Sequence, residues 1–111
     1  MGVLIWLGFE RIENLDAFTG LKVLYLERNG IKLIQGMNEL KMLRCLYLHE
    51  NVIRKIENLD FNLDINNLNL SDNCIEKIEN LGHLKKLETL QLKRNRIGVN
   101  GMDDLVGLLE L

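Results

Sequence analysis

Apolar residues alternate with polar ones in short stretches, and each stretch is followed by apolar residues at every third position. Leu24 and Leu26 flank Tyr25 and precede Glu27, and this period of two predicts a short strand with one buried face. The next apolar residues are spaced by three, which favours 3₁₀ turns over an α-helix. These outer positions are Ile31, Ile34, Met37, Leu40 and Leu43.

The whole pattern recurs every 22 residues, in rows that start at Leu21, Leu43, Ile65 and Leu87. The chain has 24 leucines and 13 asparagines, and this surplus reflects the repeated positions. Each row follows L-x-x-L-x-L-x-x-N-x-L, which is the leucine-rich-repeat pattern. One asparagine falls at the same place in every row: Asn29, Asn51, Asn73 and Asn95.

These rows predict an α/β fold, a leucine-rich-repeat solenoid with a parallel β-sheet on the concave face and short 3₁₀ turns on the convex face. The single domain covers residues 1–111. We expect a partial repeat at 1–20 and full repeats at 21–42, 43–64, 65–86 and 87–110. The asparagines are expected to form a structural ladder, because a buried amide supplies both donors and an acceptor to backbone groups at a sharp turn.

Both ends depart from the pattern. Residues 1–7 fit only a crude first strand, with Leu7 in the asparagine position. The outer-turn positions that follow are taken by Phe9, Ile12, Leu15 and Phe18. The last row keeps its period of three, at Met102, Leu105, Leu108 and Leu111, only with two extra residues near Gly98. We therefore expect a segment of a longer array, or ends that are covered in an oligomer. Asn62 occupies an apolar outer position, so Phe61 or Leu63 is expected to turn inward in its place.

Composition and charge exclude several classes of protein. The 111 residues carry a net charge of −2 with mixed signs, which gives no long-range attraction to nucleic acid or anionic lipid. No apolar run is long enough to cross a membrane, and the two cysteines make a weak disulfide framework, so a reducing compartment is expected.

The outward strand positions are the candidate binding surface. They are Val23, Cys45, Asn67 and Thr89 in one column, Tyr25, Tyr47, Asn69 and Gln91 in the next, and Glu27, His49, Ser71 and Lys93 in the third. Tyr25 and Tyr47 are adjacent, and they either anchor a partner or simply pack against each other. We favour binding, because nothing in the sequence covers this face.

No catalytic site is evident. The chain lacks a nucleophile with a base partner and lacks a phosphate-binding glycine loop. Cys45 and His49 lie near each other, but no second Cys/His pair completes a metal site. We expect no enzyme activity, no cofactor and no metal.

The motif I-E-N-L at 12–15, 56–59 and 78–81 narrows the choice of leucine-rich-repeat subtype. A 22-residue row with I-x-x-I-E-N-L resembles the repeats typified by the nuclear regulatory subunit of protein phosphatase 1. The stretches GFERIENLDAFTGLKVLYLERNGI at 8–31 and LRCLYLHENVIRKIENLD at 43–60 resemble the axonemal dynein assembly factor with leucine-rich repeats.

The second resemblance implies a non-catalytic, cytoplasmic scaffold, associated with cilia or flagella, for the assembly of dynein arms. Its protein partner would be a dynein chain or a co-chaperone. The alternative is a regulatory subunit that binds phosphatase 1 through the concave face. A third possibility is a purely structural repeat segment that self-associates through its uncapped ends.

Overall fold

The computed structural model describes residues 2–5, 7–8, 10–99 and 101–111, without the side chains at 102, 103 and 110. The expectations for Met1, for Phe9 as an outer-turn residue and for the Met102 side chain therefore lie outside the described residues. The molecule is elongated, with dimensions of 41 × 29 × 18 Å.

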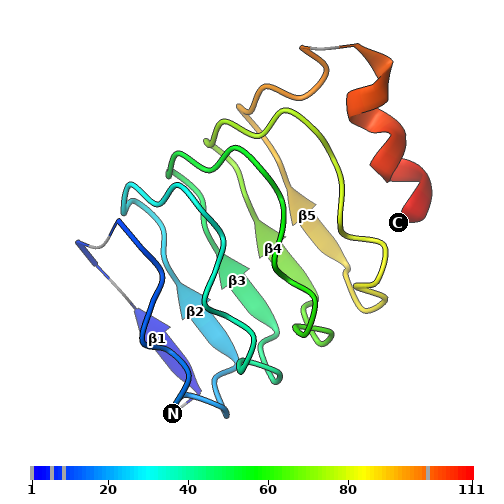
Figure 1. Cartoon of the computed structure of the whole chain (residues 1–111). Helices are drawn as coiled ribbons and strands as arrows, with labels where there is room; N and C mark the ends of the chain where they lie inside the picture. Colours follow the sequence, from blue (N-terminus) through cyan, green and yellow to red (C-terminus); the bar gives the residue numbers. More distant parts are fainter. Residues whose placement is uncertain (1, 6, 9, 100) are drawn as a thin grey trace.

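The described strands form one parallel sheet in the order β1-β2-β3-β4-β5, so each strand pairs only with its neighbours in sequence. Successive windings of the chain lie side by side along the long axis (Figure 1). The strands are β1 (Val3–Ile5), β2 (Val23–Tyr25), β3 (Cys45–Tyr47), β4 (Asn67–Asn69) and β5 (Thr89–Gln91). This arrangement confirms the predicted solenoid.

A single apolar core runs through the windings. The central residues of the inner strands, Leu24, Leu46 and Leu68, are completely buried, as are the outer-turn residues Ile34 and Ile56. Since each strand is three residues long, a winding cannot bury its own apolar face and depends on the windings beside it.

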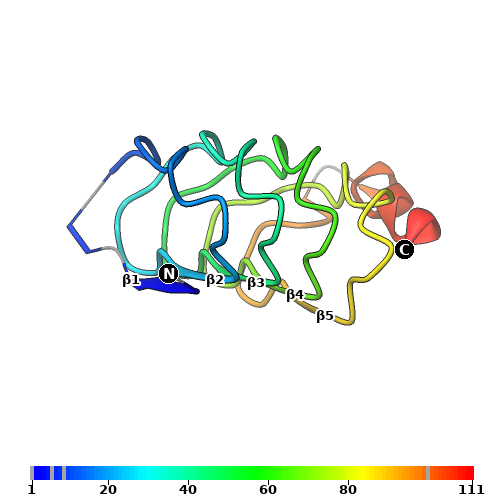
Figure 2. The same ribbon diagram turned by 90° about the horizontal axis from the view of Figure 1, so that it is seen from below.

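The outer turns follow the predicted period of three. Backbone N–H groups donate to carbonyls three residues earlier, as from Leu40 to Met37 (3.0 Å) and from Leu84 to Leu81 (3.0 Å). This is 3₁₀ hydrogen bonding. Seen along the sheet, the strands lie on one edge of the molecule and these turns on the other (Figure 2).

The asparagine column joins one winding to the next. Asn51 Oδ1 accepts from the backbone N–H groups of Asn29 (2.9 Å) and Ile31 (2.9 Å) in the preceding row. Its Nδ2 donates to the carbonyls of Leu48 (2.9 Å) in its own row and Leu26 (3.0 Å) in the row before. Equivalent bonds from Nδ2 to both rows are made by Asn73 and Asn95.

A second repeated feature, which the spacing of residues does not predict, lies in the I-E-N-L motif. Its asparagine has a positive φ, of 63° at Asn14, 61° at Asn58 and 59° at Asn80, and Gly36 (72°) takes the same place in the row that starts at Leu21. Asparagine and glycine tolerate this left-handed conformation best. Asn58 and Asn80 also donate to carbonyls of the preceding winding, each at 2.8 Å.

The first winding is shorter than a row of 22. Val3 pairs with Val23 and Ile5 with Tyr25, an offset of 20 residues. The expected place of Leu7 in the buried asparagine position is therefore wrong, and its side chain is 69% exposed.

The expected inward turn of Phe61 or Leu63 is also wrong. Asn62 is completely buried, whereas Phe61 and Leu63 are each 51% exposed. Asn62 Nδ2 donates to the carbonyls of Met37 (2.9 Å) and Leu40 (3.0 Å), and its Oδ1 is buried without a partner. The two hydrogen bonds to the neighbouring winding offset much of the cost of burying an amide.

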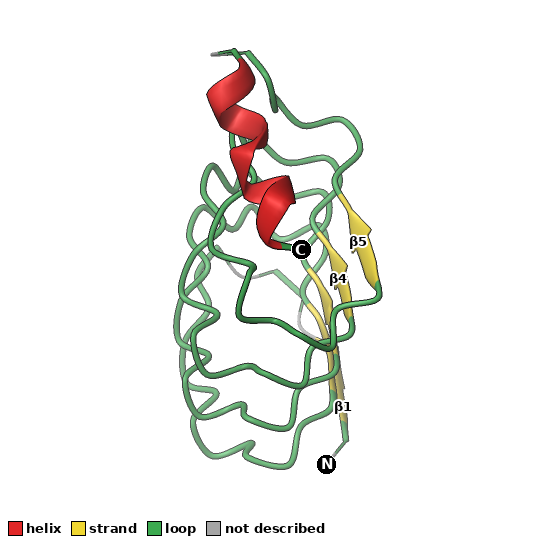
Figure 3. Cartoon of the chain, turned by 90° about the vertical axis from the view of Figure 1, so that its right-hand side faces the viewer, coloured by secondary structure: helices red, strands yellow, loops and turns green. Residues whose placement is uncertain are grey.

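The chain ends in a 3₁₀ helix, η1 (Met102–Glu110), on the side of the stack away from the strands (Figure 3). Leu108 and Leu111 were expected in core positions, but they are 49% and 54% exposed. The helix packs through Leu105, which is half-buried against the core as expected, and through Gly107, where a Cβ would lie 1.9 Å from the carbonyl oxygen of Ile78. The backbone N–H of Ile78 donates to the carbonyl of Asp104 (2.8 Å).

We predict that Asn51→Ala lowers the free energy of unfolding by about 3 kcal/mol, because it leaves several buried backbone groups of two windings without partners. Urea denaturation measures the change. Asn38→Ala, at an exposed turn position, is the matched control and is expected to change stability by less than about 0.5 kcal/mol. Equal effects of the two changes would contradict the role of the ladder.

Gly36→Ala is predicted to destabilise the fold by about 2 kcal/mol or more, because alanine strains a left-handed backbone. Its Cβ would also lie 2.8 Å from the carbonyl oxygen of Ile12. Gly20→Ala is the control, since its Cβ would meet nothing within 4 Å. Thermal unfolding of both variants tests this, and a Gly36→Ala protein as stable as the Gly20→Ala protein would be evidence against a required glycine.

Candidate functional site

The outer face of the sheet, which we call the sheet face, carries the predicted binding residues. Alternate strand residues point away from the core, and parallel register sets them in columns across the strands. On β2 to β4 these side chains are half-buried, whereas Thr89, Gln91 and Lys93 at the last strand are exposed. The structure thus brings the predicted residues together on one surface, and among these residues the ones at β5 are the most accessible.

Ser71 is the exception among them, because it is buried. Its hydroxyl accepts from the backbone N–H of Lys93 (3.1 Å), and its own N–H donates to Asn69 Oδ1 (3.0 Å). Its expected place as a partner-contacting residue is therefore corrected: Ser71 stabilises the end of β4 and offers little surface to a partner.

Tyr25 and Tyr47 stack on each other, with ring centroids 4.7 Å apart and planes at 10°. His49 meets the Tyr47 ring edge-on at 6.3 Å. The stack follows from register, because Tyr25 and Tyr47 are directly paired in adjacent strands. Burial and the neighbouring Cys45 raise the pKa of Tyr47 above the usual tyrosine value.

The apolar part of the sheet face extends further than the sequence indicated. Val3 pairs with Val23 and Ile5 with Tyr25, so the β1 side chains continue the two columns. Val3 is 51% and Ile5 64% exposed. They were missed because rows of 22 residues place β1 two residues out of register, and only the strand pairing reveals the shorter first winding.

A cleft of about 380 Å³ lies where β1 meets β2. Its lining residues are Ile5, Leu7, Tyr25, Glu27, Arg28 and His49. Apolar side chains from the first winding thus face a carboxylate and an aromatic ring from the following windings. This combination suits a side chain with an apolar stem and a polar end.

Ion pairs line the rim of the sheet face. Arg28 donates to both carboxylate oxygens of Glu50, and its Nε lies 2.5 Å from Glu50 Oε2. Arg94 donates to both oxygens of Asp72 in the same way. Each pair joins adjacent windings, and the hydrogen bond from Arg94 lowers the pKa of Asp72. Glu27 and His49 are more loosely associated, with 3.9 Å between Oε2 and Nε2.

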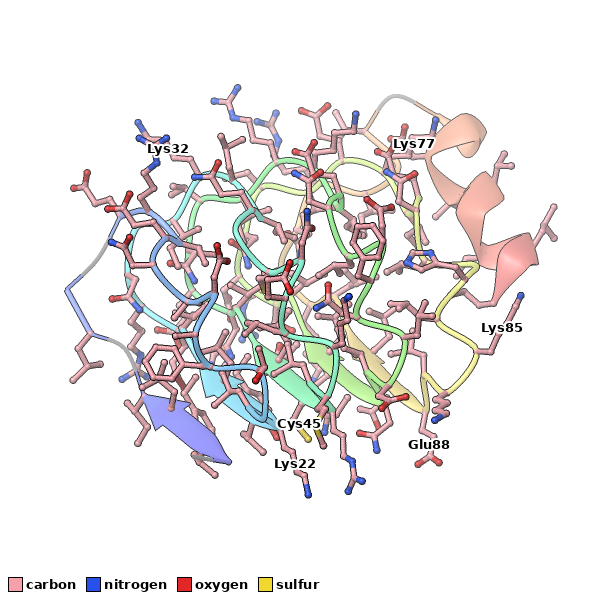
Figure 4. All side chains as sticks on the ribbon, turned by 60° about the horizontal axis from the view of Figure 1, so that its bottom comes forward. Lys22, Lys32, Cys45, Lys77, Lys85 and Glu88 are labelled. Atoms are coloured by element: carbon pink, nitrogen blue, oxygen red, sulfur yellow. The ribbon has the colours of Figure 1, made fainter. Side chains whose placement is uncertain are left out.

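Figure 4 places Cys45 beside the strands, while Lys32 and Lys77 project from the opposite side of the molecule. Cys45 and Cys74 are free thiols. No group of three or more metal-ligating side chains occurs within the described residues, and no helix in that part of the chain is long and apolar enough to span a membrane.

A second depression, of about 640 Å³, lies between the outer turn at residues 77–83 and η1. It is lined by residues that include Lys77, Glu79 and His83. His83 is half-buried, and its Nε2 lies 2.8 Å from the carbonyl oxygen of Leu59. This histidine thus links two windings.

Comparison with protein-family descriptions and with curated protein sequences gives no match. Solved structures do match. An internalin (inlF) from Listeria monocytogenes superposes over the whole chain with a TM-score of 0.77 and 24% identity. Internalin C2 from the same species matches over 90% of the chain (TM-score 0.70, 28% identity), and the functional domain of its InlJ over 91% (0.69, 23%).

The chain is a leucine-rich-repeat solenoid. It spans 33% of the inlF chain, 45% of the internalin C2 chain and 21% of the InlJ chain, so the likeness is one of repeat architecture. Such solenoids typically serve as scaffolds for protein partners rather than as enzymes.

We predict that Tyr47→Phe removes a phenol that titrates above the usual tyrosine pKa. Burial disfavours the phenolate, so the neutral form persists to higher pH in the folded protein. Ultraviolet difference titration of the wild type against the variant isolates this group. The absorbance change that is lost in Tyr47→Phe should therefore occur above the usual tyrosine pKa. If it occurs at or below that value, the stacked ring is more open to solvent than described.

Proposed function

We propose that this chain is a non-catalytic protein-interaction scaffold that serves in the cytoplasmic assembly of axonemal dynein arms. The observation that carries the interaction role is the uncovered sheet face with its stacked Tyr25 and Tyr47. Aromatic side chains dominate the binding energy of protein interfaces. Next to them, Val3, Ile5 and Leu7 expose apolar surface on the first winding, as expected of an interaction site.

The dynein-arm part of the proposal is supported by the sequence resemblance over 8–31 and 43–60. The second of these stretches includes β3, and the first ends just beyond β2, so the resemblance covers the two tyrosines. The partner is then a dynein chain or a co-chaperone, and the place of action is the cytoplasm of cells that build cilia or flagella.

The second candidate is a regulatory subunit of protein phosphatase 1. The observation in its favour is the repeated I-x-x-I-E-N-L row, shared with the subtype typified by that subunit. In this chain the asparagines of the motif support the turns, as the bonds of Asn58 and Asn80 illustrate. The motif is thus a structural feature compatible with both candidate functions. Only the identity of the binding partner distinguishes the two.

We predict that the immobilised chain retains dynein chains or their assembly factors from an extract of ciliated cells. Tyr47→Ala is expected to reduce this retention about tenfold, because it removes one ring of the stack from the centre of the sheet face. Quantitative mass spectrometry of the retained proteins measures the loss. Phe61→Ala, an equally drastic truncation at an exposed outer turn, is expected to retain them normally.

Purified phosphatase 1 catalytic subunit is tested in the same way by direct binding. Binding of the phosphatase but not of dynein proteins would replace the first candidate with the second. Retention that persists in Tyr47→Ala would refute the sheet face as the binding surface. Failure to retain any of these proteins, with sedimentation showing concentration-dependent self-association, would favour a structural repeat segment.

A further inference from the structure

The sheet face differs in charge between its two ends. Glu27 follows β2, and Lys93 takes the same place in the column after β5. We propose that this face binds an extended segment of the partner that carries a basic side chain over Glu27 and an acidic side chain over Lys93. The proposal rests on the proposed interaction role and specifies the chemistry of the segment that is bound.

Glu27 is an available anion. Within the described residues its carboxylate makes no hydrogen bond, and the nearest side-chain nitrogen of a basic residue, His49 Nε2, is 3.9 Å away. Arg28, the adjacent cation in sequence, is engaged by both oxygens of Glu50. The Glu27 side chain is only 24% exposed, so its charge is screened less than a fully solvated one and attracts a partner cation more strongly.

The surroundings of Glu27 match a long basic side chain. The cleft presents Ile5 and Leu7, which are mostly exposed, beside the Tyr25 ring. A lysine or arginine places its apolar stem on such aliphatic groups and its cation on the carboxylate. The face of a tyrosine ring also attracts a cation. Arg28 also lines the cleft, but its guanidinium is paired with Glu50. The carboxylate of Glu27 therefore favours a basic over an acidic side chain in the cleft.

The other end of the face complements this arrangement. Lys93 is exposed, and its side chain has no hydrogen bond or ion pair within the described part of the chain. The neighbouring Arg94 is held by Asp72. On the same strand as this end, Gln91 presents an exposed amide that can pair with the backbone of a bound segment. The Oδ1 atom of Asn69 on β4 already accepts from Ser71.

The distance between the charges sets the spacing in the partner. The column runs from β2 to β5 across three strand-to-strand steps, which amount to roughly 14 Å. An extended chain covers that distance in about four residues. The segment is thus expected to carry its basic and acidic residues about four positions apart.

The test uses random peptides displayed on phage and selected on the intact chain. We expect the selected peptides to share a basic and an acidic residue about four positions apart. For one of them, fluorescence anisotropy is expected to show about tenfold weaker binding to Glu27→Gln. Replacing the peptide's basic residue with norleucine should weaken wild-type binding equally and have no further effect on the variant. Glu39→Gln, at an exposed turn, is the matched control.

Peptides that lose binding to Tyr47→Ala but bind Glu27→Gln as tightly as the wild type would overturn the charge proposal and leave the interaction role standing. A selection that returns no peptide sensitive to Tyr47→Ala would overturn it as well. In that case the capture of dynein proteins or phosphatase, which needs no linear segment, would still decide the proposed function.

Discussion

The structure depends on buried amide side chains that hydrogen-bond to two windings at once. Each winding ends its strand with a sharp turn, and the turn leaves backbone N–H and C=O groups in an apolar interior where an unpaired group costs about 1–3 kcal/mol. Asn51 and Asn73 satisfy such groups in their own row and in the row before it. The same side chain therefore closes a turn and fixes the register of the stack, which in turn aligns the outward columns of the sheet face.

Much of this architecture was predictable from the sequence because it depends on spacing. The alternation around Leu24 and Leu26, the outer apolar residues at every third position and the asparagine every 22 residues specify strand, turn and stack without any knowledge of distances. The fold class follows from these three periods. The stacking of Tyr25 and Tyr47 was also open to prediction, since equal places in successive rows become neighbours in a parallel sheet.

What could not be predicted depends on distances between windings. Asn62 lies inward because two carbonyls of the preceding winding are within reach of its amide, and no pattern in the row reveals them. The exposed side chains of β1 join the sheet face because the first winding is two residues short, a fact that only strand pairing discloses. The cleft beside Glu27 was missed for the same reason, since two of its walls come from that winding.

The interfaces between adjacent windings, here called seams, differ in the side-chain hydrogen bonds that cross them. The side-chain amides of Asn58 and Asn80 each donate a hydrogen bond to the preceding winding, whereas Gly36 holds that place in the row that starts at Leu21 and contributes no side chain. Because the described strands contact only their immediate neighbours, a tensile load along the long axis passes through every seam in series. The seam at Gly36 carries that load with one amide fewer than the seams of Asn58 and Asn80, so under mechanical load it is expected to open before those two.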